Sequence, residues 1–572
     1  MWGNVNYLQS AIHKQDIPYI FIAERGVRMP NCGCLQQILT SDEELNLRSY
    51  DGKISRRSGE YLDLFNSADS SIFVFLTNYS FELDVWKKLL KDRKFHSKVK
   101  QNNHLVVVHI TALSLLLFKL LDDCSEELNE LKENIFFSFF SELQPLIVKR
   151  FTQYENCFTL FHTGHEAFSI KNRRHGDGKY LSYLGFYNWT KNPNVVLTAF
   201  KRMTNDPFHI QFYPIKKNNS LLFAEFNKVK RNHDFIDCRR LSAEEYKKAI
   251  FSAKVGLLPY DSYNYAVQAS GLLEEYLFAG VPVVVPKDTW LSFFHNLFTG
   301  GGLVFDPEIE GDFECKITSV LEDYGKHKKL ACFAAEQIAA SRGVKKYLSI
   351  LYKLDVDRAC ADVLTCDENH TYLRAIQKGV AYHFARFAEE AYCDGNVSEA
   401  QQFLSIAEQS DNAFWEIDLL KILFKTGDDK KMLGCLSARM QGGHNINPYR
   451  LIEKLEKYCI NSANAENVEL IKKIVCQTAL CDCMSFEQLY KVASLCKTIT
   501  HFDIAEEFFI KVTASDDVRL KSGALFHLGE INLKLERLQD ARDCFERCLN
   551  VNPAHERARE LLNCVCKKEV VI

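Results

Sequence analysis

The stretch SGLLEEYLFAGVPVVVP, residues 270–286, predicts a short helix that runs directly into a buried strand. Apolar residues recur at helical spacing through its first half, and Gly280 is a natural place for the helix to end. The valine-rich second half is typical of a strand that is buried on both faces of a parallel sheet. The stretch therefore predicts an α/β fold. It also raises the question of why the helix opens with Ser-Gly and carries two adjacent acids, Glu274 and Glu275.

The same alternation of strands and helices extends over residues 1–355. Strand-like segments occur at 17–23, 71–77, 105–109 and 157–163, and a second series occurs at 179–185, 208–213, 254–260 and 281–286. Amphipathic segments such as SFELDVWKKLLKD lie between them. Alternation of this kind predicts parallel sheets covered by helices, and two series in a row predict two doubly wound domains. Because such sheets bind ligands beyond the carboxyl ends of their strands, two facing domains would form a cleft.

Beyond about residue 356 the strand patterns stop, and the chain becomes helical and repetitive. The last unit has small and large residues at fixed offsets, namely Leu528, Gly529, Ala541, Phe545 and Pro553. Two earlier units place similar residues at the same offsets: Ala493, Ala505 and Phe509, and then Ala388, Ala400, Leu404 and Ala407. The pattern resembles the ~34-residue tetratricopeptide repeat, although Asn532 replaces the usual aromatic. An unrelated helical bundle is the alternative.

These patterns divide the 572-residue chain into three parts. An N-terminal Rossmann-like domain is expected at 1–165, a second Rossmann-like domain at 166–355, and an all-α tetratricopeptide-like array at 356–572. Hydrophobic residues make up 47% of the chain and charged residues 25%, as in ordinary globular proteins. The formal net charge of −3 provides no electrostatic drive toward nucleic acid or an anionic membrane.

Cysteine usage and the N-terminus predict a cytoplasmic protein. The twenty cysteines lack the paired C-x-x-C spacing of zinc sites, so reduced thiols are expected. The polar N-terminus is unlike a signal peptide. The most apolar run, residues 105–121, is interrupted by His109 and Lys119, and it predicts a strand followed by a helix rather than a transmembrane span.

Two segments resemble GT-B glycosyltransferases. Residues 183–203 look like the strand, loop and helix that open the second domain of these enzymes, and residues 241–292 look like the segment that closes their donor site. The second segment is most similar to bacterial family-4-like enzymes, through its Ser-Gly, Glu and Gly-x-Pro-Val-Val pattern. The resemblance implies a GT-B fold, with 1–165 as the acceptor-side domain and 166–355 as the nucleotide-sugar donor domain. It implies transfer of a sugar from a nucleotide-activated donor to an acceptor hydroxyl. It also implies retention of configuration, with no metal and no cofactor besides the nucleotide-sugar substrate.

A nucleotide-sugar makes physical demands that the opening stretch can meet. A carboxylate accepts hydrogen bonds from both ribose hydroxyls, and each charge-assisted bond contributes about 1.5–3 kcal/mol. A diphosphate favours backbone N–H groups at a helix N-terminus and a cation. Ser270 and Gly271 open the helix, and Gly271 has no side chain to block a phosphate. Helical periodicity does not choose between Glu274 and Glu275, and both can equally be solvated surface acids.

The resemblance assigns the remaining roles. The ribose-binding glutamate of the family stands five residues before the glycine of AGVPVVV, which selects Glu275. Lys191 lies six residues after Gly185, where the family has its phosphate-binding lysine. His109 ends a strand of the first domain, at a position similar to the family's sugar-contacting histidine, and is the expected catalytic residue. A surface lysine and a structural histidine are the simpler alternatives.

Departures from the family pattern support a different function. Phe186 stands where the family often has arginine, and Val267 stands where it often has a second glutamate. The N-terminal sequence is typical of a helix and then the second strand, so the first strand and its Gly-rich loop are expected to be missing. The alternative is a catalytically degenerate GT-B domain that acts as a scaffold, with the repeats holding a protein partner or a protein acceptor. A nucleotide-sugar epimerase is a third hypothesis.

Overall fold

The computed structural model describes most of the α/β region and parts of the helical region. The described residues are 21–24, 35–39, 50–67, 72–77, 80–152, 154–160, 178–186, 189–203, 208–213, 236–237, 241–298, 300–342, 346, 349–351, 353–354, 370–424, 489–490, 493–494, 496–497 and 502–569. The domain boundaries expected near 165 and 355 lie outside them, as does the expected N-terminal helix.

The chain separates into two compact units. The first is Met1–Phe387 with Ile406–Asp411, and the second is Ala388–Ser405 with Asn412–Ile572. The division falls inside one long helix, α16 (His370–Cys393), so most of this helix, up to Phe387, belongs with the parallel sheets.

A six-stranded parallel sheet forms the centre of the second α/β domain. Its strands are β7 (Tyr180–Phe186), β8 (Phe208–Tyr213), β9 (Ile236–Asp237), β10 (Ala253–Leu257), β11 (Val283–Pro286) and β12 (Gly302–Phe305). Their spatial order is β12-β11-β10-β7-β8-β9, and every neighbouring pair is parallel. This is the doubly wound 3-2-1-4-5-6 order, in which the winding direction reverses between the first and fourth strands. The switch point of this sheet therefore lies between β7 and β10.

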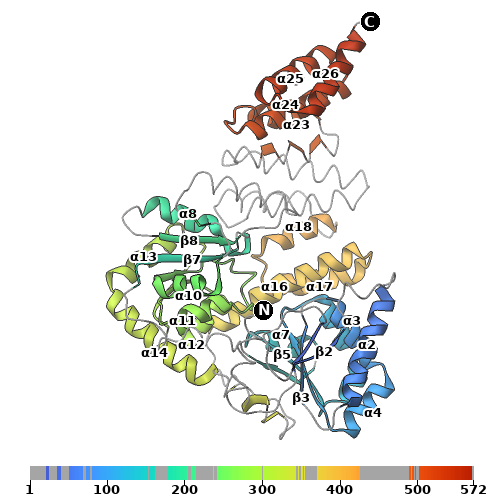
Figure 1. Ribbon diagram of the computed structural model, residues 1–572, viewed down its shortest axis with the longest axis vertical. Coiled ribbons are helices and arrows are strands. Elements are labelled where there is room, and N and C mark those ends of the chain that lie inside the picture. Colours follow the sequence, from blue (N-terminus) through green and yellow to red (C-terminus); the bar gives the residue numbers. More distant parts are fainter. Residues whose placement is uncertain are drawn as a thin grey trace. The chain divides into compact units, whose positions relative to one another are not determined.

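Helices cover both faces of this sheet. They are α8 (Pro193–Arg202), α10 (Ala243–Ser252), α11 (Gly271–Phe278), α12 (Trp290–Leu297), α13 (Asp312–Glu322) and α14 (Tyr324–Arg342). Because parallel crossovers are right-handed, reversal of the winding direction puts α8 and α11 on opposite faces, as Figure 1 shows. Gly256 of β10 permits close packing of α11, since a Cβ atom there would lie 2.7 Å from the ring of Tyr276.

The stretch 270–286 folds as its sequence predicts. Ser270 caps α11, and its side chain accepts a hydrogen bond from the Leu273 amide. The helix ends at Phe278 with Ala279 as its C-cap, and Gly280 has φ 61°, a left-handed value that favours glycine after a helix. Strand β11 is buried along its whole length, as expected for a central parallel strand.

The first α/β domain contains a four-stranded parallel sheet. Strands β3 (Ile72–Thr77), β4 (Leu105–Ile110), β5 (Ile135–Phe139) and β6 (Cys157–Thr159) are neighbours in chain order. A separate parallel pair is formed by β1 (Phe21–Glu24) and β2 (Leu35–Leu39). The surrounding helices are α2 (Tyr50–Ser67), α3 (Ser80–Leu90), α4 (Arg93–Gln101), α5 (Leu115–Asp123), α6 (Ser125–Glu130) and α7 (Gln144–Thr152).

Strand β5 was absent from the sequence prediction, although it lies inside this sheet. Its sequence IFFSF is buried throughout and carries no polar alternation, so its period is ambiguous. Parts of two predicted strands, at 17–20 and 161–163, lie outside the described residues. The apolar run 105–121 is β4 followed by α5, as predicted. Among the helices that the structure describes, none is long and apolar enough to cross a membrane.

The described part of the C-terminal region is helical. Its helices are α17 (Val397–Ser410), α18 (Trp415–Leu423), α23 (Phe502–Val512), α24 (Val518–Lys534), α25 (Leu538–Val551) and α26 (Glu556–Glu569). The small residues picked out by the repeat pattern are all fully buried: Ala388, Ala400, Ala407, Ala493, Ala505 and Ala541. A Cβ atom on Gly529 of α24 would lie 2.5 Å from the ring of Phe545 in α25. The absence of a side chain at Gly529 thus lets the consecutive helices α24 and α25 pack closely.

We expect Gly529→Ala to destabilise this helical region by about 1–3 kcal/mol, because the added methyl group overpacks a buried contact with Phe545. The matched control is Gly325→Ala in α14, where a Cβ atom would meet nothing within 4 Å and helix propensity favours alanine. Hydrogen exchange in α24 and α25 should rise in the first variant and stay unchanged in the second. Equal protection in α24 and α25 for Gly529→Ala and wild type would contradict the packing described.

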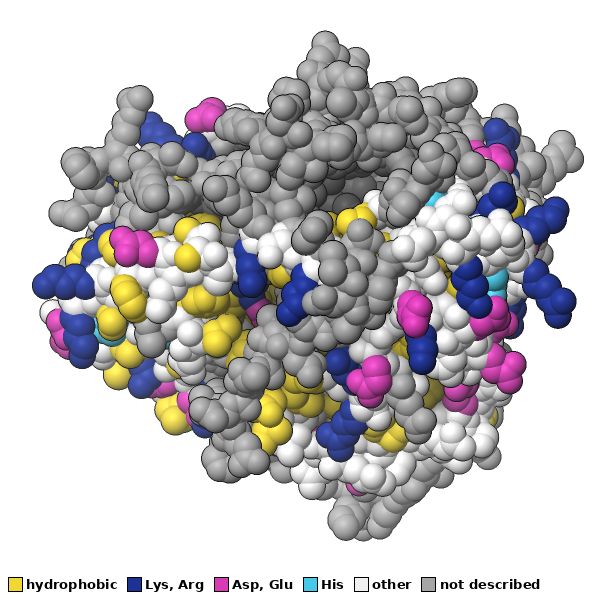
Figure 2. All heavy atoms as spheres, turned by 90° about the horizontal axis from the view of Figure 1, so that it is seen from below, with side chains coloured by type: hydrophobic (Ala, Val, Ile, Leu, Met, Phe, Trp, Pro, Cys, Tyr) yellow, Lys and Arg dark blue, Asp and Glu magenta, His cyan; other side chains and the backbone are white. Residues whose placement is uncertain are grey.

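The fold class predicted from the sequence is confirmed: two α/β domains with parallel sheets precede a helix-rich region. On the face shown in Figure 2, basic and acidic side chains are interspersed, in keeping with the formal net charge of −3.

Candidate functional site

The loop after β7 places Lys191 next to the carboxyl end of that strand. The chain passes through a short 3₁₀ helix, Trp189–Lys191, and enters α8 through Asn192, which has a left-handed φ of 45°, and Pro193 at the first helical turn. A Cβ atom on Gly185 would lie only 3.2 Å from Nζ of Lys191. The absence of a side chain at Gly185 thus makes room for the ammonium group at the carboxyl end of β7.

Backbone and aromatic contacts hold this loop next to β10. The Asp261 amide donates to the Thr190 carbonyl at 2.9 Å, which ties the loop to the segment following β10. Nζ of Lys191 lies 5.0 Å from the ring centre of Tyr260, in cation–π geometry. Lys191 is therefore positioned between the carboxyl ends of β7 and β10, at the switch point of the sheet.

Glu275 projects from α11 toward the same place. Its Oε2 accepts a hydrogen bond of 2.5 Å from the Tyr246 hydroxyl on α10. Burial raises the pKa of Glu275 to about 7, while the Tyr246 hydrogen bond and the positive charge of Lys191 act in the opposite direction. The structure thus brings together three predicted residues, Gly185, Lys191 and Glu275, from segments well separated in sequence.

Ser270 and Gly271 form the start of α11. The Ser270 hydroxyl is buried and serves as the helix cap, since it accepts from the Leu273 amide. Gly271 is the first helical residue and is partly exposed. The positive end of the α11 dipole therefore lies just N-terminal to Glu275, where an anion would be stabilised.

Glu274 faces away from this site. It is 0% exposed, and its Oε1 lies 3.5 Å from a guanidinium nitrogen of Arg342, the last residue of α14. Burial and the neighbouring charge of Glu275 raise the pKa of Glu274. The possibility that both acids of the opening stretch are solvated surface groups is wrong for Glu274.

Arg342 joins the two α/β domains within the first unit. It also forms an ion pair with Glu142, which follows β5, and its guanidinium lies over the ring of Phe294 at 4.4 Å. The other carboxylate oxygen of Glu142 accepts from the Trp290 indole N–H at 2.8 Å. A buried arginine thus bridges carboxylates of both domains, and one of them, Glu274, is the sequence neighbour of Glu275.

His109 lies in a closed environment. Its side chain is 1% exposed, its Nδ1 is 2.8 Å from the Ser138 hydroxyl on β5, and the ring of Phe140 lies 4.0 Å away. Burial lowers the pKa of His109 to about 3, so the imidazole is neutral at physiological pH. The structure does not place His109 in contact with Lys191 or Glu275 among the interactions of the described residues.

The end of β4 nevertheless borders the segment that leads into α11. The side-chain amide of Gln268 donates to the Thr111 carbonyl at 3.4 Å, and Gln144 donates to the Oε1 of Gln268 at 3.3 Å. Val267 is fully buried, and a Cβ atom on Gly379 of α16 would lie 2.6 Å from its Cγ1. The side chain of Phe186 lies outside the described residues.

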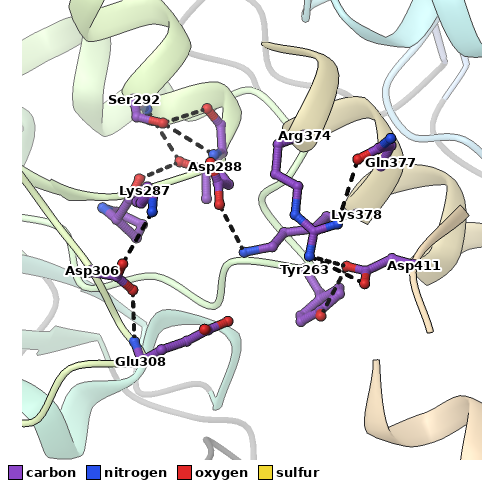
Figure 3. A network of polar contacts seen from close by, with 12 residues as sticks. Tyr263, Lys287, Asp288, Ser292, Asp306, Glu308, Arg374, Gln377, Lys378 and Asp411 are labelled. Atoms are coloured by element: carbon purple, nitrogen blue, oxygen red, sulfur yellow. Dashed lines mark hydrogen bonds and ion pairs between the residues drawn. The ribbon is translucent and has the colours of Figure 1, made fainter. Parts of the chain in front are cut away.

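A network of polar contacts, drawn in Figure 3, holds Tyr263 in the segment between β10 and α11. Asp411 accepts from the Tyr263 hydroxyl at 3.1 Å and pairs with Arg374 of α16 at 3.2 Å. Lys378 of α16 pairs with Asp288 at 3.4 Å and lies 5.4 Å from the ring centre of Tyr263. Helix α16 therefore supports the loop between β10 and α11.

Tyr246, Tyr260 and this network were not predicted from the sequence. Tyr246 is one aromatic residue in an amphipathic helix, and its contact with Glu275 depends on where the tertiary fold places α10 and α11. Two features could have drawn attention to the network: Lys378 stands among apolar residues of α16, and Asp411 follows a long helix. Neither identifies a partner.

Among the described residues, no group of three or more histidine, cysteine, aspartate or glutamate side chains could hold a metal ion. Lys191 contributes a cation at the switch point, and Glu275 contributes a carboxylate. This pair suits a ligand that carries both an anionic group and hydroxyl donors.

No protein-family model matches the chain, and no curated protein sequence matches it. Several solved structures are similar in three dimensions. One is Anabaena Alr3699/HepE in complex with UDP and glucose, at 10% identity and a TM-score of 0.43, covering 62% of this chain and 96% of that chain. Another is a glycosyltransferase from Rickettsia africae, at 10% identity and a TM-score of 0.44, covering 62% and 94%.

A third is the catalytic domain of starch synthase IV from Arabidopsis thaliana bound to ADP and acarbose, at 10% identity and a TM-score of 0.38, covering 55% of this chain and 81% of that chain. Identity is low in all three, so the function is inferred from the residues of the site.

Proposed function

We propose that this chain is a GT-B glycosyltransferase that binds a nucleotide-sugar at the carboxyl edge of the six-stranded sheet. The observation that carries the proposal is the convergence of Lys191 and Glu275 at the switch point between β7 and β10. Open parallel sheets bind nucleotides at this place because the strand ends leave a crevice there. The opposite charges of the two side chains match the two ends of a nucleoside diphosphate.

In this proposal each residue has a distinct task. Glu275 accepts hydrogen bonds from the ribose hydroxyls. Lys191 and the N-terminus of α11 at Ser270 and Gly271 stabilise the diphosphate, first as part of the donor and then as the leaving group, whose negative charge grows as the glycosidic bond breaks. Gly185 keeps the space in which the ammonium lies. The reaction is proposed to retain configuration and to need no metal.

The test is transfer from a panel of labelled nucleotide-sugars, with release of nucleoside diphosphate as the readout. Wild type is expected to release diphosphate from at least one donor, and Glu275→Gln to release it at least about tenfold more slowly at low donor concentration, since a charge-assisted bond is lost. Release at the same rate in Glu275→Gln would contradict the site assignment.

Nucleotide binding is expected to strengthen between pH 6 and pH 8. Burial raises the pKa of Glu275 to about 7, and the ionised carboxylate accepts hydrogen bonds from the ribose hydroxyls more strongly than the neutral acid does. The ionised fraction rises from about a tenth at pH 6 to about nine-tenths at pH 8. Calorimetric titration of UDP, ADP and GDP should show a larger rise in wild type than in Glu275→Gln, because the phosphates titrate equally with both proteins and only wild type adds the ionisation of Glu275. Parallel pH profiles of the two proteins would rule out the effect.

A nucleotide-binding scaffold without transfer activity is the second candidate function. The burial of His109 favours it, because a 1%-exposed, neutral imidazole paired with Ser138 is not available to a sugar. Binding of nucleoside diphosphates without turnover of any donor would support the scaffold. Loss of turnover in His109→Asn, with unchanged nucleotide affinity, would instead support a catalytic role for His109.

We also propose that the C-terminal helices form a tetratricopeptide-like array that holds a protein partner or a protein acceptor. The close approach of α24 and α25 at Gly529 and the burial of the repeat's small residues support this reading. We propose further that the protein is cytoplasmic, which is compatible with the use of a nucleotide-sugar donor.

A further inference from the structure

Tyr246 is the aromatic residue that directly contacts the candidate ribose-binding carboxylate. It lies on α10, whose N-terminus is fixed by a capping box between Ser242 and Glu245 one turn earlier. The hydroxyl of Tyr246 reaches Oε2 of Glu275 at 2.5 Å. A short bond between a neutral hydroxyl and a carboxylate is a strong, directional interaction.

We propose that Tyr246 is a positioning residue, which sets the orientation and charge of the Glu275 carboxylate for recognition of the ribose diol of a nucleotide. The inference rests on the proposed function, because that proposal makes the ribose hydroxyls the ligand of Glu275. It adds a residue from a helix that the sequence did not connect with the site.

The geometry supports a positioning role over a purely structural one. Glu275 lies on the partly exposed side of α11, while its neighbour Glu274 points into the buried contact with Arg342. Without the bond from Tyr246, the Glu275 side chain would be free to sample other rotamers, and losing that freedom on ligand binding would weaken affinity. One strong hydrogen bond to Oε2 restricts the carboxylate before the ligand arrives.

Among the described residues, titratable groups from four parts of the fold lie near Glu275. They are Lys191 from the 3₁₀ helix, Tyr246 from α10, Tyr260 after β10 and Glu274 on its own helix. Burial raises the pKa of Glu275 to about 7, and the Tyr246 hydroxyl lowers it. Removing that hydroxyl therefore raises the pKa further and leaves less carboxylate ionised at neutral pH.

The experiment compares two ligand types on the full chain. Calorimetry measures binding of UDP, ADP and GDP, which carry a ribose diol, and of inorganic pyrophosphate, which does not. The variants are Tyr246→Phe, Glu275→Gln and the double variant. Tyr180→Phe is the matched control, because Tyr180 is a half-exposed tyrosine at the opposite end of β7.

Tyr246→Phe is expected to weaken the nucleoside diphosphate that binds wild type about three- to tenfold, because one hydrogen bond to a charged group is lost. Pyrophosphate affinity should not change. The pH midpoint of nucleotide binding should move upward. The double variant should bind no more weakly than Glu275→Gln, since Tyr246 acts through that carboxylate.

Three other outcomes would contradict the inference, and they show whether the proposed function fails with it. If Glu275→Gln weakens nucleotide binding and Tyr246→Phe does not, the inference is wrong and the proposed function stands. If Tyr246→Phe weakens nucleotide and pyrophosphate equally, its role is structural. If wild type binds none of the nucleoside diphosphates, or Glu275→Gln binds them as wild type does, the proposed site and the inference both fail.

Discussion

Replacement of Lys191 by methionine is expected to weaken nucleoside-diphosphate binding about ten- to hundredfold. The ammonium group lies at the switch point, over Gly185 and 5.0 Å from the ring centre of Tyr260. A charge-assisted contact with a phosphate contributes about 1.5–3 kcal/mol, which corresponds to that loss. Methionine keeps most of the aliphatic chain and removes the charge, so packing is largely preserved. Calorimetric titration of the full chain with UDP, ADP and GDP measures the effect.

The matched control is Lys254→Met. Lys254 lies on β10 of the same sheet, and its ammonium is 5.1 Å from the ring centre of Tyr324, so it makes the same kind of cation–π contact away from the switch point. Its replacement should leave nucleotide affinity within about twofold of wild type, as for a surface substitution. Equal affinity losses in the two variants would mean that the protein's general charge, and not a site at Lys191, attracts the ligand.

The largest expected effect on stability belongs to Arg342. Arg342→Met should lower the free energy of unfolding of the first unit by about 3–5 kcal/mol, because it leaves Glu142 and Glu274 buried without their shared cation. Urea unfolding followed by tryptophan fluorescence is a suitable measurement, since four of the five tryptophans, Trp2, Trp86, Trp189 and Trp290, belong to this unit.

Arg202→Met provides the comparison for this variant. Arg202 also pairs with two glutamates, Glu310 and Glu314, but its side chain is 50% exposed. Solvent screens such a pair, so its loss should cost no more than about 1 kcal/mol. A result in which both variants lose the same small amount would show that the Arg342 network contributes little to the stability of the unit.

The sequence predicted the local structure around the site well. Three local features were predicted: the helix start at Ser270, the left-handed Gly280 and the buried valines of β11. Each depends on residues close in sequence, so apolar periodicity and the position of glycine are enough to predict it. The spacing of Lys191 from Gly185 likewise described one loop. These features required no knowledge of how distant segments pack.

Tertiary packing accounts for what the sequence did not predict. Glu274 and Glu275 are adjacent and equivalent in the helical pattern, and only their partners Arg342 and Tyr246 distinguish them. Those partners come from α14 and α10, and nothing in their local sequence points to α11. Strand β5 escaped prediction because a five-residue apolar run has no measurable period.

The central claim is that a nucleoside diphosphate binds at the switch point between β7 and β10. The most direct measurement is a crystal structure of the full chain with the diphosphate that binds most tightly among UDP, ADP and GDP. The proposed site predicts the diphosphate beside Lys191 and the start of α11, with the ribose hydroxyls on Glu275. Density for the nucleotide elsewhere, with Lys191 and Glu275 in solvent, would contradict the claim.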